Sequence, residues 1–468
     1  MNGSTIDDAL ADTRLNAFHI AIMCWCSMLM LFDGYDLAIY GSVLPQLMSD
    51  WKLSPVAAGI IGSSPLFGMM VGALTLGSSS DRFGRRRVIL ACLILFGVAA
   101  LATGFSQNTV QFTVCRFLTG IGLGAMVPNV VALMSEMSPR SHRNIMVTIV
   151  LSVYSVGGVI AALIGKAVTP VVGWRADFLI AGLQLLAFPF LLRALPESAI
   201  YLLLRERYAE AAPILKRLAP NSQISPERLA RLTQARSDTP TRSIDLFTHG
   251  RAADTLLLWI ALGMCMLMVY GLSTWLPKLM AANGYSIGSS LTFLITLNVG
   301  ALLGGLLSGW LADRYGGKPT LIGFFLVAAV SVALLGYRQN AVMLDILLMC
   351  AGATTIGTLC IESAFAAQQY PSTIRSTGVG WATAAGRLGA MAGPALGGYL
   401  ISQDFSISFS FIVFAIPGAV AALATMLMSS ARGGAATERV RRLAAPASIV
   451  LHRNVRGRNA KRGTTDED

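Results

Sequence analysis

The sequence is poor in charged residues. Asp, Glu, Lys and Arg make up only 13% of its 468 residues, whereas a soluble domain carries about 25%. Apolar residues make up 54%, and runs of the ~20 residues needed to cross a bilayer recur along almost the whole chain. This composition excludes a soluble domain and predicts an all-α polytopic membrane protein.

The residue patterns of common enzymes and of nucleotide-driven pumps are also missing. There is no Gly-x-Ser-x-Gly elbow, no His-Glu-x-x-His and no Cys/His cluster. The seven cysteines lie in apolar segments and form no disulfide framework. A phosphate loop is excluded because Gly317-Lys318 is followed by Pro319, and Ala312 stands where its first glycine should be. We therefore expect no enzyme, no metal, no cofactor and no nucleic-acid partner.

Hydropathy predicts twelve spans, and their even number places both termini on one side. The first seventeen residues have no leader pattern. The net charge is 36 − 24 = +12, and basic residues gather in the connections that follow even-numbered spans, which are expected to be cytoplasmic. The protein is predicted to lie in the plasma (bacterial inner) membrane with both termini in the cytoplasm. The spans are 18–48, 56–76, 88–105, 110–134, 145–168, 176–195, 255–280, 289–312, 319–336, 341–366, 376–401 and 406–429.

These spans divide the chain into two groups of six. We expect a cytoplasmic tail at 1–17, a first bundle at 18–195, a cytoplasmic linker at 196–254, a second bundle at 255–429 and a basic cytoplasmic tail at 430–468. Within the linker, Ser198 to Leu218 has the spacing of a surface helix along the inner membrane face. The alternative for this segment is a plain flexible linker. The basic tail is predicted to be disordered or to lie on anionic lipid.

The two groups repeat at a constant offset of 232 residues. Leu44-Pro45-Gln46-Leu47-Met48 recurs as Leu276-Pro277-Lys278-Leu279-Met280, and Pro139 and Arg143 recur as Pro371 and Arg375. The repeat predicts two pseudo-symmetric six-helix bundles related by an axis along the membrane normal, with a substrate site between them near mid-depth. A monomer is the default for this plan.

Five charged residues lie inside the predicted spans and break the repeat. A charge at mid-depth costs at least ~2.5–3.5 kcal/mol, and such residues usually face a cavity or a partner. Their equivalents at the offset are uncharged, so the symmetric scaffold does not require them, and we assign them to transport chemistry. The alternative is that they form structural ion pairs. The residues are Asp33, Asp36, Arg116, Glu362 and Arg387, opposite Cys265, Met268, Leu348, Val130 and Ser155.

Several motifs resemble those of a known family. Gly77-Ser-Ser-Ser-Asp81-Arg82-Phe83-Gly84-Arg85-Arg86-Arg87 resembles the signature of the major facilitator superfamily, with a weaker copy at 309–319. Asp33-Gly34-Tyr35-Asp36 resembles the hallmark of its aromatic acid:proton symporters, as do 370–381 and Gly386-Arg387-Leu388-Gly389. The resemblance implies import of benzoate, a hydroxybenzoate, gentisate or a similar acid with protons, by alternating access. The alternative is an exporter or symporter of that superfamily for another small organic acid, sugar or drug.

The resemblance and the chemistry of carboxylates together give candidate site residues. Arg387 is predicted to bind the substrate carboxylate, because guanidinium is a planar two-pronged donor. Arg116 lies nearer the outer end of its helix and is expected to pair with Asp33 or Asp36. One of these aspartates is predicted to carry the proton, since burial and a like-charged neighbour both favour the protonated form. We expect Asp36→Asn to abolish proton-driven accumulation.

Further residues are predicted from polarity and motif. Glu362 is interpreted as a second protonatable group or as the neutraliser of an arginine, and Asn298 as a partner for a ring hydroxyl or for another helix. Aromatic residues for the apolar slot are Tyr40, Tyr154, Trp259, Tyr270, Trp275, Phe365 and Trp381. Arginines of the repeated turns are expected to pair with acids across the cytoplasmic interface. The predicted gating residues are Gly77, Asp81, Arg82, Arg85, Asp313 and Arg314.

Overall fold

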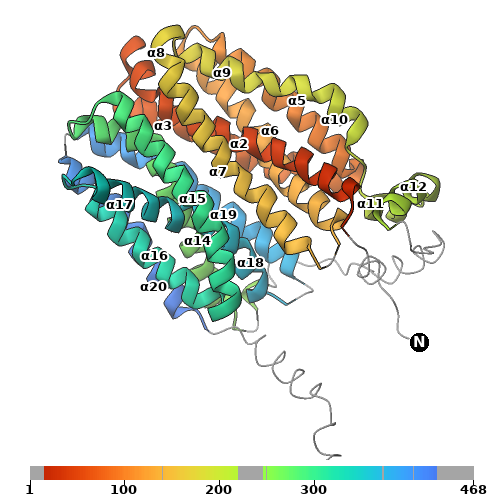
Figure 1. Ribbon diagram of the computed structural model, residues 1–468. Coiled ribbons are helices and arrows are strands. Elements are labelled where there is room, and N and C mark those ends of the chain that lie inside the picture. The colour runs from red at the N-terminus through yellow and green to blue at the C-terminus, as the bar shows by residue number, and fades with distance from the viewer. Residues whose placement is uncertain are drawn as a thin grey trace, which may run out of the picture.

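A computed structural model describes residues 15–77, 79–139, 141–219, 246–248, 250–371, 374–403 and 405–429. In these ranges the secondary structure is helical and contains no strand. The predicted tails at 1–17 and 430–468 and the middle of the linker fall largely or wholly outside the described residues. The helices form two bundles that lie side by side (Figure 1), which confirms the predicted all-α fold.

The first bundle begins with α2 (Ala17–Asp50) and α3 (Pro55–Gly72), which runs on into a π-helical turn, η1 (Ala73–Gly77). Short α4 (Ser80–Phe83) leads to α5 (Arg85–Gly104), α6 (Thr109–Met137) and α7 (Arg143–Ala167). Side-chain oxygens of Ser54 and Asn108 cap α3 and α6 by accepting backbone N–H bonds. After α8 (Thr169–Val172), the sixth span is built from α9 (Trp174–Gly182), η2 (Leu183–Ala187) and α10 (Phe188–Ala194).

The linker forms two short helices where the sequence predicted a single one. These are α11 (Ala199–Leu204) and α12 (Tyr208–Leu218), and the chain turns between them at Glu206, whose φ is +59°. The amide Nδ2 of Asn16 donates to the carbonyl of Arg217 at 2.9 Å. The linker is therefore held against the start of α2.

The second bundle contains α14 (Ala252–Ala282), α15 (Ile287–Tyr315) and α16 (Gly317–Leu334). Its fourth span is interrupted: α17 (Ala341–Thr354) is followed by η4 (Ile356–Thr358) and α18 (Leu359–Gln369). It ends with α19 (Arg375–Ser402) and α20 (Ile407–Leu427). Eleven helical runs among the described residues are long and apolar enough to cross a membrane; the twelfth long helix is α19, with 28 residues, seven glycines and Arg387.

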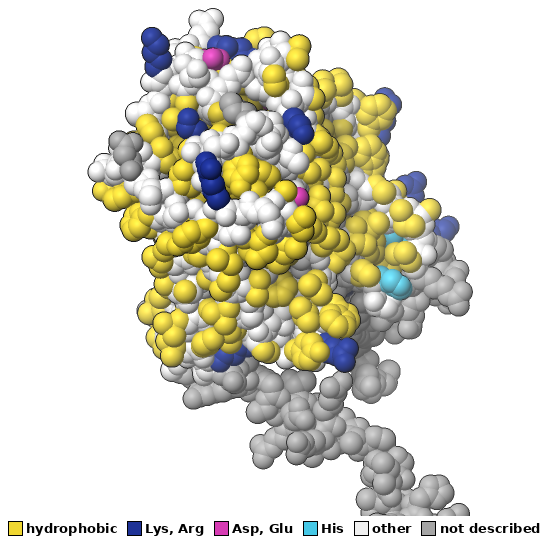
Figure 2. All heavy atoms as spheres, turned by 60° about the vertical axis from the view of Figure 1, so that its left-hand side comes forward, with side chains coloured by type: hydrophobic (Ala, Val, Ile, Leu, Met, Phe, Trp, Pro, Cys, Tyr) yellow, Lys and Arg dark blue, Asp and Glu magenta, His cyan; other side chains and the backbone are white. Residues whose placement is uncertain are grey.

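The outer surface agrees with a lipid environment. Figure 2 shows broad areas of hydrophobic side chains, among which acidic side chains are few. Large apolar residues on several helices are more than half exposed, for example Ile60, Val330 and Leu388. In water such a surface would cause aggregation, whereas acyl chains cover it without cost.

The two halves meet through α2 with α14, α3 with α19, and α7 with α15. We call the end of the bundles near α4, α11 and α12 the linker end, and the opposite end the far end. Close backbone approaches between the halves lie toward the far end. A Cβ on Gly41 would stand 2.0 Å from the Ser273 carbonyl oxygen, and one on Gly398 would stand 2.4 Å from that of Pro55. Glycine thus allows the halves to touch there.

This contact gives a test of the packing. We expect Gly41→Ala to lower the free energy of unfolding by about 1–3 kcal/mol, because the added methyl overlaps a carbonyl group. The measurement is the unfolding midpoint of the purified protein in detergent. Gly380→Ala is the matched control, since a Cβ there meets no atom within 4 Å; equal midpoints for the two variants would contradict the close contact.

Candidate functional site

Asp36 and Arg116 form a fully buried ion pair inside the first bundle. Nη1 of Arg116 donates to both carboxylate oxygens of Asp36, at 2.7 and 2.8 Å, and Nη2 donates to the Asp36 backbone carbonyl at 3.2 Å. The two side chains are 1% and 0% exposed. The Arg116 guanidinium also lies over the ring of Phe178, 5.5 Å from its centroid. Of the two aspartates, Asp36 is therefore the one that pairs with Arg116, and it joins α2 to α6.

Asp33 lies one turn earlier on α2 and has a different environment. It is 4% exposed, and its Oδ1 has no hydrogen-bond partner. Its electrostatic neighbours are Arg387 of the second bundle and Asp36. The two aspartates therefore divide their contacts: one is held within its own bundle, and the other faces the opposite half.

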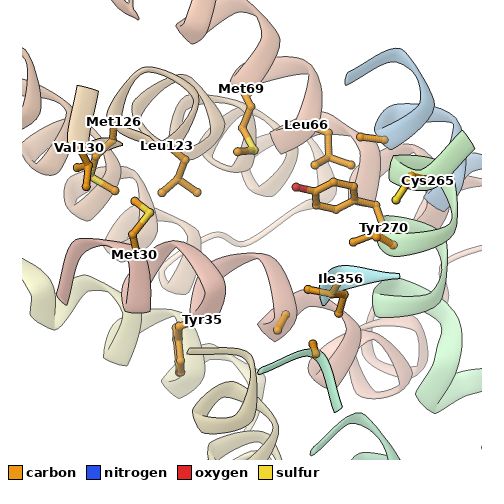
Figure 3. Packing of buried hydrophobic residues seen from close by; sticks show 14 of the residues in the cluster. Met30, Tyr35, Leu66, Met69, Leu123, Met126, Val130, Cys265, Tyr270 and Ile356 are labelled. Atoms are coloured by element: carbon orange, nitrogen blue, oxygen red, sulfur yellow. The ribbon is translucent and has the colours of Figure 1, made fainter. Parts of the chain in front are cut away.

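Arg387 projects from α19 toward residues of both halves. Its Nη1 lies 3.3 Å from the hydroxyl of Tyr270 on α14 and 3.5 Å from Sδ of Met69 on α3. Figure 3 shows Met69, Leu66 and Tyr270 directed toward a common region from their separate helices. No carboxylate among the described side chains lies within ion-pair distance of Arg387, and guanidinium has five N–H donors. Its capacity to bind an anion is therefore largely unused.

Tyr154 of α7 completes this group. Its hydroxyl interacts with that of Tyr270, and both rings are electrostatic neighbours of Asp33 and Arg387. The position of Tyr154 depends on Gly34, because a Cβ at Gly34 would stand 1.8 Å from the Tyr154 carbonyl oxygen. The glycine between the two aspartates thus lets α7 lie directly against α2.

We call Asp33, Tyr154, Tyr270 and Arg387 the central group. It joins one carboxyl that lacks a cation within bonding distance, one guanidinium with open donors, and two hydroxyls. Such a set suits a small planar anion, because guanidinium binds carboxylate in a bidentate manner and stacks on aromatic rings. Sequence analysis had named all four side chains, but it had not identified Met69, whose sulfur contacts Arg387.

Two predicted binding residues use their polar atoms in helix packing. The Tyr40 hydroxyl donates to the carbonyl of Ala58 at 2.6 Å, which ties α2 to α3. Nδ2 of Asn298 donates to the Leu294 carbonyl at 2.9 Å, and its Oδ1 packs on Gly158 of α7. Of the two interpretations of Asn298, the structure therefore provides the helix contact. A role in substrate binding stays a prediction for both.

Two others lie apart from the central group. Trp381 stacks on Trp259 with ring centroids 5.9 Å apart and planes at 15°, and it is 46% exposed. It precedes Arg387 by six residues, about 9 Å along the helix toward the linker end. Glu362 is 2% exposed and lies in α18 beside Cys265. It is not within ion-pair distance of any described arginine, so the interpretation of Glu362 as an arginine's neutraliser is wrong for this structure.

The predicted gating residues cluster at the linker end. Arg85 pairs with Glu136 of its own half, Nε to Oε1 at 2.8 Å. Arg82 and Arg314 are exposed and lie over aromatic rings of neighbouring residues in their own segments. The expected pairing of these three arginines across the two halves is therefore not present here, because the described inter-half contacts lie toward the far end. Gly77 ends η1, Asp313 is exposed, and the side chain of Asp81 lies outside the described ones.

Sequence analysis missed two acids. Glu136 binds Arg85 and also accepts from Ser198 Oγ at 2.5 Å, so it joins the Gly77–Arg87 motif to the start of the linker. Asp177 is 0% exposed and accepts from Thr169 Oγ1 at 2.5 Å. Both lie near the predicted span ends, where a charge is ordinary and draws no attention.

With this geometry established, the chain was compared with known proteins. The family model for the Major Facilitator Superfamily matches residues 26–357 and 258–459. The chain belongs to the major facilitator superfamily. It is therefore a transporter and not an enzyme.

Individual relatives narrow the place of this transporter. It is 39% identical to the benzoate transport protein of Acinetobacter baylyi over 435 residues, covering 91% of this chain and 93% of that one. It is 32% identical to the gallate transporter of Pseudomonas putida over 430 residues, covering 91% and 95%. The inward-open structure of the E. coli xylose transporter XylE has a TM-score of 0.71 at 20% identity, covering 88% and 96%, which supports the fold.

The buried pair gives a test in this transporter. Asp36→Asn leaves the Arg116 guanidinium in the membrane interior without a counter-charge, which we expect to lower the free energy of unfolding by about 3–5 kcal/mol. Asp36→Leu combined with Arg116→Met should recover most of that loss, because it removes both charges. Unfolding midpoints in detergent measure the effect. Arg207→Ala, which breaks an exposed pair with Glu210, is the control and should change little; a similar small change in Asp36→Asn would refute the structural role.

Proposed function

We propose that this transporter imports an aromatic carboxylate together with protons across the plasma membrane by alternating access. The names of the relatives support the substrate class, since those proteins transport benzoate and gallate. The observation that carries the proposal is the central group. In it, a carboxyl and a guanidinium from opposite halves face each other, and neither has a charged partner within bonding distance.

Competition for Arg387 couples the proton to the substrate in this proposal. Ionised Asp33 is attracted to the Arg387 guanidinium and opposes the entry of a second anion. Protonation of Asp33 removes that negative charge and leaves the guanidinium to the substrate carboxylate. Asp36 does not serve as the carrier in this scheme, because the Arg116 guanidinium already holds its carboxylate by two hydrogen bonds. It fixes the position of the helix that carries Asp33.

The same group provides binding for the ring of the substrate. The hydroxyls of Tyr154 and Tyr270 lie beside Arg387, and the apolar side chains of Leu66 and Met69 border the same region (Figure 3). An aromatic acid needs a cation at one end and an apolar wall along the ring. Substituents of the ring then meet hydroxyl groups that donate or accept hydrogen bonds.

Alternating access requires the far-end contacts to open while the linker end closes. The far-end contacts are carried by glycine against backbone, which permits helices to slide and part without rearranging long side chains. The basic linker end faces the cytoplasm in this proposal, in accordance with the positive-inside rule. Each bundle then moves as a unit, and the transporter works as a monomer.

The first test is direct. We expect cells that express the chain to grow on and accumulate a radiolabelled acid from a panel of benzoate, hydroxybenzoates, gentisate and gallate, and a protonophore to abolish the accumulation. Cells without the chain are the control. Increased resistance to a drug, with no uptake of any acid, would instead favour an exporter.

Asp33→Asn tests the coupling. Amide cannot carry the proton and cannot compete as an anion for Arg387, so we expect uphill accumulation to fall at least tenfold while exchange of labelled for unlabelled acid persists. Both are measured in the same membrane vesicles. Arg387→Lys should weaken both, because ammonium lacks the planar fork. Uphill uptake at the wild-type level in Asp33→Asn would overturn the assignment.

A further inference from the structure

The fourth span of the second bundle is broken near its middle. The break lies at Thr355–Thr358, between α17 and α18, and leaves carbonyl groups that a continuous helix would satisfy. Cys265 of α14 donates its thiol to the Thr355 carbonyl, with Sγ 3.8 Å from the oxygen, and Ser308 of α15 donates to the Gly357 carbonyl at 3.3 Å. Irregular backbone at membrane depth is tolerated only inside protein or beside a water-filled cavity.

The break is specific to one half of the molecule. At the offset of 232 residues its counterpart is 123–126 in α6, which is one unbroken helix of 29 residues. The pseudo-symmetric scaffold therefore does not need a break at this place. Discontinuous helices near mid-depth mark the sites of substrates and coupling ions in transporters built from repeats.

A buried carboxyl stands one turn beyond the break. Glu362 is 2% exposed, and neither of its oxygens has a hydrogen-bond partner. The thiol of Cys265 lies against it, but the hydrogen bond of that thiol goes to Thr355. A carboxylate in such a place lacks both solvent and a counter-ion, so the group is stable there as the neutral acid.

The charged groups of the surrounding helices are directed elsewhere. The helices packed on α18 are α7, α14, α15, α16 and α19, and on these Cys265 is the titratable side chain placed at Glu362. The described charged side chains of these helices include Lys166, bonded to Thr292, Asp254, bonded to Ser429, Lys318, bonded to two carbonyls near the end of α20, the exposed Asp313 and Arg314, and Arg387, bonded to Tyr270.

Glu362 and Asp33 occupy related places in the two halves. Cys265, the neighbour of Glu362, is the equivalent of Asp33 at the offset of 232 residues. Each bundle thus brings one buried carboxyl without a bonded cation to the same position of its first helix, from α2 itself in one half and from α18 in the other. The chemistry is repeated although the residue and the helix that supply it differ.

We propose that Glu362 is a second proton carrier, which takes up a proton when the far end is open and releases it when the linker end is open. This inference rests on the proposed function. With Asp33 as the first carrier, two protons accompany one monovalent substrate anion, so each cycle moves one net positive charge inward. Transport is then driven by the membrane potential as well as by the pH gradient.

The test uses the full-length protein in liposomes with radiolabelled benzoate as the probe, and protein-free liposomes to subtract permeation of the neutral acid. For the wild type, an inside-negative potassium diffusion potential at equal pH should drive uptake. With the potential clamped at zero and a pH difference of one unit, accumulation should approach ~100-fold for two protons and ~10-fold for one. We expect Glu362→Gln to lose the response to potential and to reach the lower limit.

Two matched variants serve as controls. Glu362→Asp keeps a carboxyl and should retain the response to potential, and Asp345→Asn removes an exposed acid from α17 and should behave as wild type. Potential-independent uptake by the wild type would overturn the inference even if Glu362→Gln failed to fold, as would a sodium requirement at fixed pH or an undiminished response in Glu362→Gln. Wild-type protein that moves no acid of the panel under a pH gradient would instead contradict the proposed function.

Discussion

The low polarity of the membrane interior is the constraint on which the site depends. Every charge placed there requires a partner or must be neutral, and the ion pair of Asp36 with Arg116 meets that requirement completely. Two hydrogen bonds to the carboxylate and one to the backbone carbonyl fix α2 against α6. Because Asp33 lies one turn away on the same helix, this pair also determines where the second carboxyl is presented.

Glycine contacts determine which distances in the site are fixed and which are variable. Gly34 and Gly157 let α2 and α7 touch backbone to backbone, so Asp33 and Tyr154 are held together within one bundle. Arg387 and Tyr270 are held together within the other bundle by a hydrogen bond of 3.3 Å. When one bundle tilts against the other, the separation that changes is that between Asp33 and Arg387. The electrostatic interaction between carboxyl and guanidinium thereby becomes a function of conformation.

Much of this architecture could be predicted from the sequence. Hydropathy placed the spans, and the 232-residue repeat gave the two bundles, because both patterns follow from helix length and gene-level duplication of a packing unit. Charges that broke the repeat identified Asp33, Asp36, Arg116 and Arg387, because a symmetric scaffold leaves them unexplained. The break before α18 was not predicted, since Thr355–Thr358 contains no proline and its carbonyls are satisfied by side chains distant in sequence.

Side-chain direction was the other limit. Tyr40 and Asn298 have the polarity of binding residues, yet their polar atoms are used by Ala58 and Leu294, and no local pattern reveals such partners in advance. Asp177 was overlooked because it stands close to a span end, where burial of an acid depends on how the following helix turns inward. Predictions from spacing were therefore reliable for helices and for isolated charges, and weaker for neutral polar groups.

The contrast between the two arginines explains why one is structural and the other is suited to binding. Arg116 is 1% exposed and directs its terminal nitrogens to acceptors of its own bundle. Arg387 is only partly buried and contacts a hydroxyl and a thioether, neither of which carries a charge. A guanidinium whose donors lack anionic acceptors in a region of low polarity gains more from a carboxylate than one already paired. Free energy that a symmetric ion pair would have used for stability is thus available for the transported anion.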